Sequence, residues 1–156
     1  MMKTNQLCYQ MTILQCPRCD AKTLVNGVEA ITCSSCNACY PLRDGIPQLL
    51  KDPSLFTQLE AIDYDDHHNI DEIRREKVAT DWKIVFGRHN PVYGDVLEIG
   101  SGTGQLTWGL ANRFPFQSVS ACDISTRFLL QAANVVGDAP VPVNYYACDA
   151  NHMPFQ

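Results

Sequence analysis

The sequence lacks any long run of apolar residues. No segment approaches the roughly 20 consecutive apolar side chains that a membrane-spanning helix needs, and the N-terminal residues lack the sustained apolar stretch of a secretory leader. We therefore expect neither a membrane span nor a signal peptide. Charge is also scarce, at 19% of residues, and the 12 basic side chains are outnumbered by 17 acidic ones. That balance argues against a chain whose main task is to hold nucleic-acid phosphate, although a nucleic acid stays open as a substrate.

Cysteine, by contrast, is plentiful and unevenly placed. Of the 8 cysteines, five crowd into residues 16–39, whereas Cys122 and Cys148 lie far downstream in apolar stretches. A secreted disulfide framework would spread its bridges along the chain and would follow a leader. The clustering instead indicates reduced thiols, most of them committed to a metal, in a cytoplasmic protein.

The cysteine cluster contains two C-x2-C pairs, Cys16 with Cys19 and Cys33 with Cys36. Four thiolates from two such pairs complete the closed, tetrahedral shell of a structural zinc ion. Between the pairs, the step Asn26-Gly27 separates two apolar stretches, which predicts a hairpin with a type I′ turn. Residues 1–51 are therefore predicted to form a small, β-rich zinc-ribbon domain that binds Zn²⁺ for a structural purpose.

Cys39 leaves an alternative open, because it follows Cys36 at the same spacing. We prefer to interpret it as a small core residue, with the symmetric pairs as ligands. The second pair is followed by YPLRDGIPQLL, residues 40–50. The knuckle–hairpin–knuckle pattern with this segment resembles the short zinc-ribbon family that includes the small activator partners of RNA and release-factor methyltransferases. The resemblance covers about residues 10–51 and implies a module that binds a protein partner or presents a substrate.

Residues 52–91 are predicted to be a helical linker. Asp52-Pro53 is typical of a helix start, and a short helix is expected after it. A second, amphipathic helix is predicted up to Gly87. Its apolar side chains fall on helical spacing and should lie on the next domain: Ile70, Ile73, Trp82, Val85 and Phe86.

A glycine-rich loop begins the C-terminal part of the chain. Residues 96–99, VLEI, are followed at once by GSGTG, residues 100–104, and then by a stretch of helical spacing that ends before Pro115. This order predicts a strand, a sharp turn and a helix, where missing Cβ atoms let a ligand approach. The loop has no P-loop lysine and fails the G-x-G-x-x-G dinucleotide pattern, which disfavours a nicotinamide-dependent oxidoreductase. An acid at the strand end, Glu98, suits a ligand with cationic groups.

Two further predicted strands each end in an acid. Residues 119–122 precede Asp123, which lies 19 residues after Gly104, and residues 143–148 precede Asp149. Ser125 is a predicted N-cap and Gly137 a predicted stop for the helix between these strands. Because the carboxyl ends of parallel strands line one crevice, we expect Glu98, Asp123 and Asp149 to gather there.

These stretches resemble the first three motifs of the class I S-adenosylmethionine-dependent methyltransferases, as VLEIGSGTGQLT, ACDIS and CDANHMPF. The resemblance covers about residues 92–156. It implies an α/β fold containing the first three parallel strands, with helices, of a Rossmann-like methyltransferase sheet, and S-adenosylmethionine as cofactor. It places Glu98 near the cationic end of the cofactor, Asp123 at the ribose hydroxyls, and Asp149 at the adenine edge. The cofactor-binding residues that it implies are Glu98, Gly100, Ser101, Gly102, Gly104, Asp123, Ile124, Asp149 and Ala150.

Three parts are thus predicted: a zinc ribbon (1–51), a helical linker (52–91) and a truncated methyltransferase domain (92–156). Only seven residues follow Asp149, so we expect the cofactor half of a site without most of its acceptor half. An edge of the sheet should stay unpaired, at the third strand or beside the first. The predicted function is an S-adenosylmethionine-dependent methyltransferase whose acceptor and catalytic residues are open. The alternative is a non-catalytic zinc-ribbon binding or activator module with a vestigial methyltransferase segment.

Overall fold

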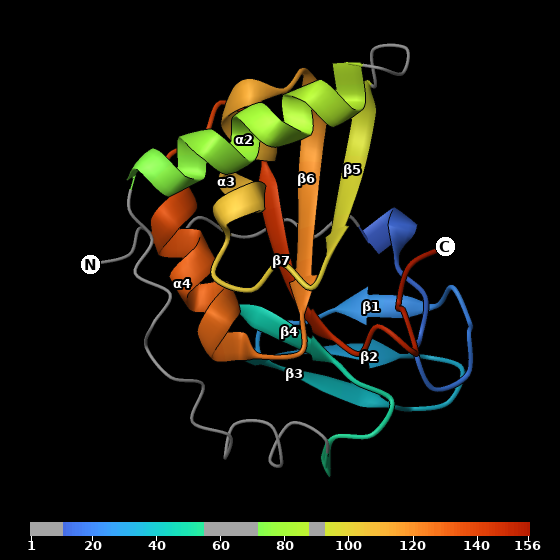
Figure 1. Ribbon diagram of the computed structural model, residues 1–156. Coiled ribbons are helices and arrows are strands. Elements are labelled where there is room, and N and C mark those ends of the chain that lie inside the picture. The colour runs from blue at the N-terminus through green and yellow to red at the C-terminus, as the bar shows by residue number, and fades with distance from the viewer. Residues whose placement is uncertain (1–10, 55–71, 88–92) are drawn as a thin grey trace.

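The computed structural model describes residues 11–54, 72–87 and 93–156 (Figure 1). Within these ranges, seven strands join one mixed sheet in the order β1-β2-β3-β4-β7-β6-β5. The short helix expected after Pro53 lies mostly outside the described residues. No helix in the described ranges is long and apolar enough to cross a membrane.

The N-terminal segment builds four short antiparallel strands after a 3-10 turn, η1 (Met11–Ile13). They are β1 (Leu24–Asn26), β2 (Ala30–Cys33), β3 (Cys39–Arg43) and β4 (Ile46–Leu49). The predicted hairpin between β1 and β2 forms, but the predicted type I′ turn is wrong. Strand β1 ends at Asn26 and β2 begins at Ala30, which leaves residues 27–29 as the connection, and neither Asn26 nor Gly27 has a positive φ. The amide of Gly27 instead donates to the carbonyl of Ala30 at 2.9 Å, which closes a longer turn.

The second hairpin, between β3 and β4, was not predicted from the sequence. Its two turn residues, Asp44 and Gly45, have φ values of 49° and 80°. Two consecutive positive φ angles are the requirement of a type I′ turn, and Asp-Gly is a preferred pair for it. The type I′ turn that was expected at Asn26-Gly27 is therefore found at Asp44-Gly45.

The C-terminal segment alternates strands and helices, as the sequence predicts. The strands β5 (Gly94–Ile99), β6 (Phe116–Asp123) and β7 (Val143–Cys148) run parallel. Helices α3 (Gln105–Arg113) and α4 (Thr126–Val136) connect them. Ser125 caps α4 by accepting a hydrogen bond from the Phe128 amide at 3.3 Å, and Gly137 follows the helix with φ 59°. The predicted α/β class and the Rossmann-like character of this segment are confirmed.

The two segments share the sheet, because β4 pairs in parallel with β7 (Figure 1). Gln48 lies opposite Ala147 and Leu49 opposite Cys148. Of the two edges expected to be unpaired, the one at β7 is thus covered by the chain's own β4. Among the described residues, β5 pairs with β6 alone. On β5, Leu97 and Ile99 are 39% and 55% exposed.

Helix α2 (Glu72–Gly87) packs on α3. Of its predicted apolar face, Phe86 packs against Phe114 and Phe116, with ring centroids 5.3 and 6.1 Å away, and Ile70 lies outside the described residues. Other residues of that face are exposed: Ile73 by 81%, Val85 by 48% and Trp82 by 38%. Ala79, which was not predicted, packs closely on α3, since a Cβ on Gly109 would lie 3.1 Å from the Ala79 Cβ. Polar contacts set this rotation of the helix: Glu76 pairs with Arg113, and the guanidinium of Arg75 lies over the Trp108 ring at 5.4 Å.

Candidate functional sites: a strand-end hollow and a cysteine cluster

A hollow opens at the carboxyl ends of the three parallel strands. Five of the predicted cofactor residues line it: Gly100, Asp123, Ile124, Asp149 and Ala150. Its wall also contains three residues that the sequence interpretation missed, Ile99, Cys122 and Cys148. Each of these three lies next to a predicted site residue at the end of a strand. The predicted strand ends could therefore have indicated them as wall residues.

Asp123 shapes the glycine loop as well as lining the hollow. One of its carboxylate oxygens accepts a hydrogen bond from the Gly102 amide at 2.9 Å. The other accepts one from the Ser125 amide, also at 2.9 Å, at the start of α4. Each carboxylate oxygen offers two lone-pair directions, so both retain acceptor capacity for a hydroxyl in the hollow. Asp123 therefore joins the loop, the helix start and the hollow.

The glycine loop requires glycine for two different reasons. Gly100 and Gly102 have φ values of 71° and 52°, and an added Cβ would meet nothing within 4 Å at either position. Their need is conformational, and the space beside them is open. At Gly104 the φ is 86° and an added Cβ would lie only 2.6 Å from the Cβ of Ala132 on α4. Gly104 thus lets the loop pack against α4, while Gly100 and Gly102 leave room for a ligand.

Ser101 and Glu98 are buried and do not line the hollow. The Ser101 hydroxyl is buried and has no hydrogen-bond partner. Glu98 is 8% exposed and accepts a hydrogen bond from the Thr107 hydroxyl at 2.6 Å. Burial, together with the charge of Asp123, raises the pKa of Glu98 to about 7 despite the lowering effect of the Thr107 hydrogen bond. Glu98 is therefore electrostatically linked to Asp123, although it does not line the hollow.

Asp149 is held in a local turn at the opposite wall. One carboxylate oxygen accepts from both the backbone and the side-chain nitrogen of Asn151 at 2.9 Å. The other lies 3.2 Å from Nδ1 of His152. The Asn151 amide and the His152 ring lower the pKa of Asp149, so the group stays ionised. The hollow is thus bordered by two carboxylates, and no basic side chain is among its described lining residues.

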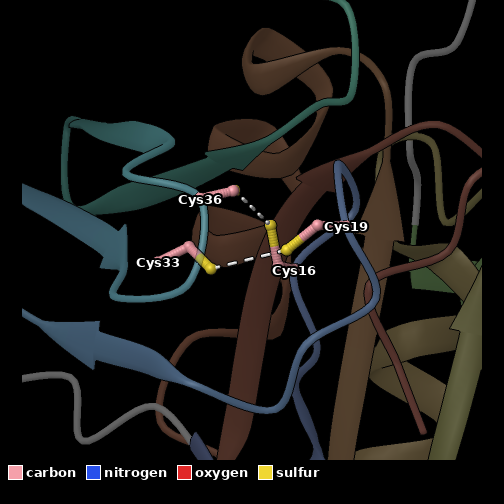
Figure 2. A group of neighbouring side chains, drawn as sticks. All are labelled: Cys16, Cys19, Cys33 and Cys36. Atoms are coloured by element: carbon pink, nitrogen blue, oxygen red, sulfur yellow. Dashed lines mark hydrogen bonds between the residues drawn. The ribbon is translucent and has the colours of Figure 1, made fainter.

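The four predicted metal ligands come together in the N-terminal segment (Figure 2). The sulfur atoms of Cys16, Cys19, Cys33 and Cys36 all lie within 4.8 Å of one another. The sulfur atoms of Cys16 and Cys36 are 3.7 Å apart, and so are those of Cys19 and Cys33. Tetrahedral zinc with Zn–S bonds of about 2.3 Å requires sulfur–sulfur distances of about 3.8 Å. The cluster is therefore compatible with a tetrahedral metal site.

The two knuckles have the same backbone geometry. The Asp20 amide donates to the Cys16 carbonyl at 2.8 Å, and the Asn37 amide donates to the Cys33 carbonyl at 2.9 Å. Asp20 and Asn37 have φ values of 58° and 57°, in the left-handed region that Asp and Asn tolerate best among side-chain-bearing residues. The sequence pattern C-x-x-C-[D/N] thus encodes two equivalent turns that point their thiols at one place.

Two side chains outside the cluster support its sulfur atoms. The Tyr40 hydroxyl lies 3.0 Å from the Cys16 sulfur in a buried hydrogen bond. The Thr23 hydroxyl lies 3.6 Å from the Cys33 sulfur. Cys39 is exposed and is not part of the group of four converging sulfurs. Tyr40 and Thr23 were missed from the sequence, where neither stands at a diagnostic spacing.

Comparison with known proteins bears on the C-terminal segment. Residues 96–156 match the family model described as a methyltransferase domain. The segment that carries this match is the one that holds the glycine loop and the two hollow-lining carboxylates. These residues are therefore similar to a methyltransferase domain. The prediction made from the three motifs is thereby confirmed at the level of the family.

Individual methyltransferases are also similar to this chain. A tRNA (guanine-N(7)-)-methyltransferase from Streptococcus mutans is 31% identical over 70 residues, covering 45% of this chain and 32% of that protein. The crystal structure of an S-adenosylmethionine-dependent methyltransferase from Clostridium acetobutylicum is 22% identical with a TM-score of 0.36, covering 62% of this chain and 37% of that one. The chain thus spans about a third of the length of these methyltransferases.

The hollow of this methyltransferase segment fits the family's cofactor chemically. S-adenosylmethionine carries a cationic sulfonium, and two carboxylates border the hollow with no base among its described residues. The open space beside Gly100 and Gly102 admits a ligand at backbone distance. The unpartnered hydroxyl of Ser101 is a polar group that a ligand or a water can satisfy.

Proposed function

We propose that this chain is the cofactor-binding part of an S-adenosylmethionine-dependent methyltransferase that carries a structural zinc ribbon. The observation that supports it most is the convergence of Asp123, Asp149 and a Cβ-free bend on one hollow at the ends of parallel strands. When bound, the cofactor supplies an activated methyl group. The contribution of the protein is then to hold and orient it, which is a matter of proximity more than of acid–base chemistry.

The roles of the chain's own residues follow from their contacts. Asp123 would accept hydrogen bonds from the ribose hydroxyls with the lone pairs that Gly102 and Ser125 leave free. Asp149, with Ala150, would lie at the adenine edge. Glu98 would act from its buried position, where its ionised form favours a cation. No catalytic residue is assigned, and the acceptor would be bound largely by groups outside residues 93–156.

Calorimetric titration of the zinc-loaded chain with S-adenosylmethionine tests this proposal. We expect binding to the wild-type chain and a loss of at least tenfold in affinity for Asp123→Ala. The matched control is Asp138→Ala, an exposed acid after α4 whose loss changes the net charge equally. Absence of binding at millimolar cofactor would refute the proposal and favour the alternative of a non-catalytic binding or activator module.

We also propose that the four-cysteine cluster holds Zn²⁺ as a structural ion. Four thiolates leave no open coordination position, so the metal would stabilise the ribbon and take no part in the reaction. Metal analysis of the purified chain should give one zinc per molecule, and Cys33→Ser should lose it. The exposed Cys39 provides the control, since Cys39→Ser should retain one zinc. Loss of zinc in Cys39→Ser and retention in Cys33→Ser would reassign the ligands.

A cytoplasmic location and a protein partner bound through the ribbon stay predictions. The first is supported by the need of a thiolate metal site for reduced cysteines. The second is supported only by the resemblance of residues 10–51 to activator proteins.

A further inference from the structure

A second hollow lies on the ribbon and is not used by the proposed cofactor site. Three of its described lining residues are cationic, Arg18, Arg43 and Lys51, and none is acidic. All three cations are exposed, whereas other lining residues are buried, including Ala38, Tyr40 and Leu50. The hollow therefore has a basic rim above a mainly apolar floor. We call it the basic hollow.

The basic hollow differs in charge both from the chain as a whole and from the hollow at the ends of the parallel strands. The whole chain has a formal net charge of −5, so the presence of three cationic residues and no acidic one among the described lining residues is not a general property of its surface. We call the hollow at the ends of the parallel strands, proposed above to bind the cofactor, the cofactor hollow. It has two acids, Asp123 and Asp149, and no base among its described lining residues. An anionic ligand would be repelled from the cofactor hollow and attracted to the basic hollow.

The two hollows lie beside one pair of strand ends. Leu49 of β4 is opposite Cys148 of β7, and the two strands run parallel. The chain that leaves β4 supplies Leu50 and Lys51 to the basic hollow. The chain that leaves β7 supplies Asp149 and Ala150 to the cofactor hollow. A ligand anchored in the basic hollow would thus extend along the same edge of the sheet as the cofactor.

We propose that the basic hollow binds the phosphates of a single-stranded RNA segment that carries the methyl acceptor. This inference rests on the proposed function, because it assigns a substrate class to the same enzyme. A nucleotide combines an anionic phosphate with a flat, partly apolar base, which matches a basic rim over an apolar floor. An acidic peptide offers charge to the rim but little to the floor. The two guanidinium groups also provide the planar forks that pair with phosphate oxygens.

The binding of a fluorescein-labelled, mixed-sequence, single-stranded 15-nucleotide RNA to the zinc-loaded chain tests this inference by anisotropy. We expect the triple variant R18A/R43A/K51A to bind at least tenfold more weakly than wild type. Each lost phosphate contact should reduce the slope of log affinity against log salt by about 0.7, so the triple should lose about 2. Because Arg18 lies between two metal ligands, the double variant R43A/K51A is measured as well, with its zinc content.

The matched control is the triple variant K22A/K77A/K83A, which removes the same charge from exposed positions outside the basic hollow. Equal RNA affinities of the two triples, or no binding by wild type at low salt, would overturn the inference. Displacement of the RNA by a glutamate-rich peptide at equal concentration would overturn it in favour of a protein partner. Calorimetry of the wild-type chain with S-adenosylmethionine separates the two proposals. Cofactor binding without RNA binding would overturn the RNA site alone, and RNA binding without cofactor binding would overturn the cofactor site alone.

Discussion

Leu49 of the ribbon strand β4 lies directly beside Cys148 of the methyltransferase strand β7 in a parallel ladder. Leu49 is 0% exposed and belongs to the same buried cluster as Cys148. That cluster also contains Cys16 and Cys33 from the metal site, and Cys122 from the wall of the cofactor hollow. One continuous core therefore supports both sites, although Cys33 and Cys122 are 89 positions apart in the sequence.

Removal of the metal is predicted to destabilise the methyltransferase segment as well as the ribbon. Structural zinc typically contributes on the order of 10 kcal/mol of coupled folding energy. If metal removal lowers the unfolding free energy of the shared core by only about 4 kcal/mol, the melting temperature of a chain of this size should fall by about 10 °C. Both tryptophans, Trp82 and Trp108, lie outside the ribbon, on α2 and α3. Thermal unfolding followed by tryptophan fluorescence, with and without a chelator, thus reports on the C-terminal part alone.

The cysteine variants provide a control for this prediction. Cys33→Ser should reproduce the effect of the chelator, whereas Cys39→Ser, at an exposed position outside the cluster, should melt like wild type. A tryptophan transition that is indifferent to metal would mean that the ribbon and the parallel strands unfold independently.

The sequence predicted the local units of this fold better than their assembly. The strand–glycine loop–helix order and the cap at Ser125 depend on neighbouring residues, so pattern and propensity were sufficient to find them. The pairing of Leu49 with Cys148 joins residues 99 positions apart, and no local pattern encodes such a contact. The orientation of α2 was predicted only in part: Phe86 packs on the domain as expected, but Ile73 is exposed, and Arg75 and Glu76 contact α3.

The candidate sites show the same division. Spacing alone identified the four converging thiols, since the two knuckles encode their own turns. It also identified Asp123 and Asp149, which the parallel strands bring to one edge. The buried hydrogen bond of Tyr40 to Cys16 depends on the packing of β3 under the first knuckle, and it could not be read from either segment alone. Glu98 was expected in the crevice, but it is buried and does not line the hollow.

Tyr40→Phe is predicted to weaken metal binding while preserving the fold. The hydroxyl forms a 3.0 Å hydrogen bond with Cys16, and Phe keeps the ring that packs in the core. Loss of such an outer partner of a metal ligand typically costs about 10- to 100-fold in affinity. Zinc affinity is measured by competition with a chromophoric chelator. Tyr93→Phe, at a position that is 68% exposed, is the control and should leave the affinity unchanged. Equal affinities for both variants would show that Tyr40 supports packing alone.

Gly104→Ala is predicted to be more destabilising than Gly137→Ala. Both glycines have positive φ, 86° and 59°, so both substitutions carry a conformational cost of about 1–2 kcal/mol. Only at Gly104 would the new Cβ also lie 2.6 Å from the Cβ of Ala132, whereas Gly137 has nothing within 4 Å. Overpacking adds about 1–3 kcal/mol. Urea unfolding at neutral pH should therefore rank the variants clearly, and equal midpoints would contradict the close packing of the loop on α4.

Glu98→Gln is predicted to stabilise the chain at pH 8 but not at pH 4.5. Burial raises the pKa of Glu98 from 4.5 to about 7 in the folded state. A raised carboxyl pKa favours folding while the group is protonated, and this contribution is lost as the pH rises from 4.5 through 7. The ionised, buried group then costs about 3 kcal/mol, which Gln avoids while keeping an acceptor for Thr107.

The pH dependence of urea unfolding for wild type and Glu98→Gln measures this effect. The wild-type free energy of unfolding should fall relative to that of the variant between pH 5 and pH 8, and the difference should level off above pH 8. Glu76→Gln is the control of opposite sign, because Arg113 lowers the pKa of the exposed Glu76. A difference between wild type and Glu98→Gln that does not change with pH would mean that Glu98 is ionised in the fold at no electrostatic cost.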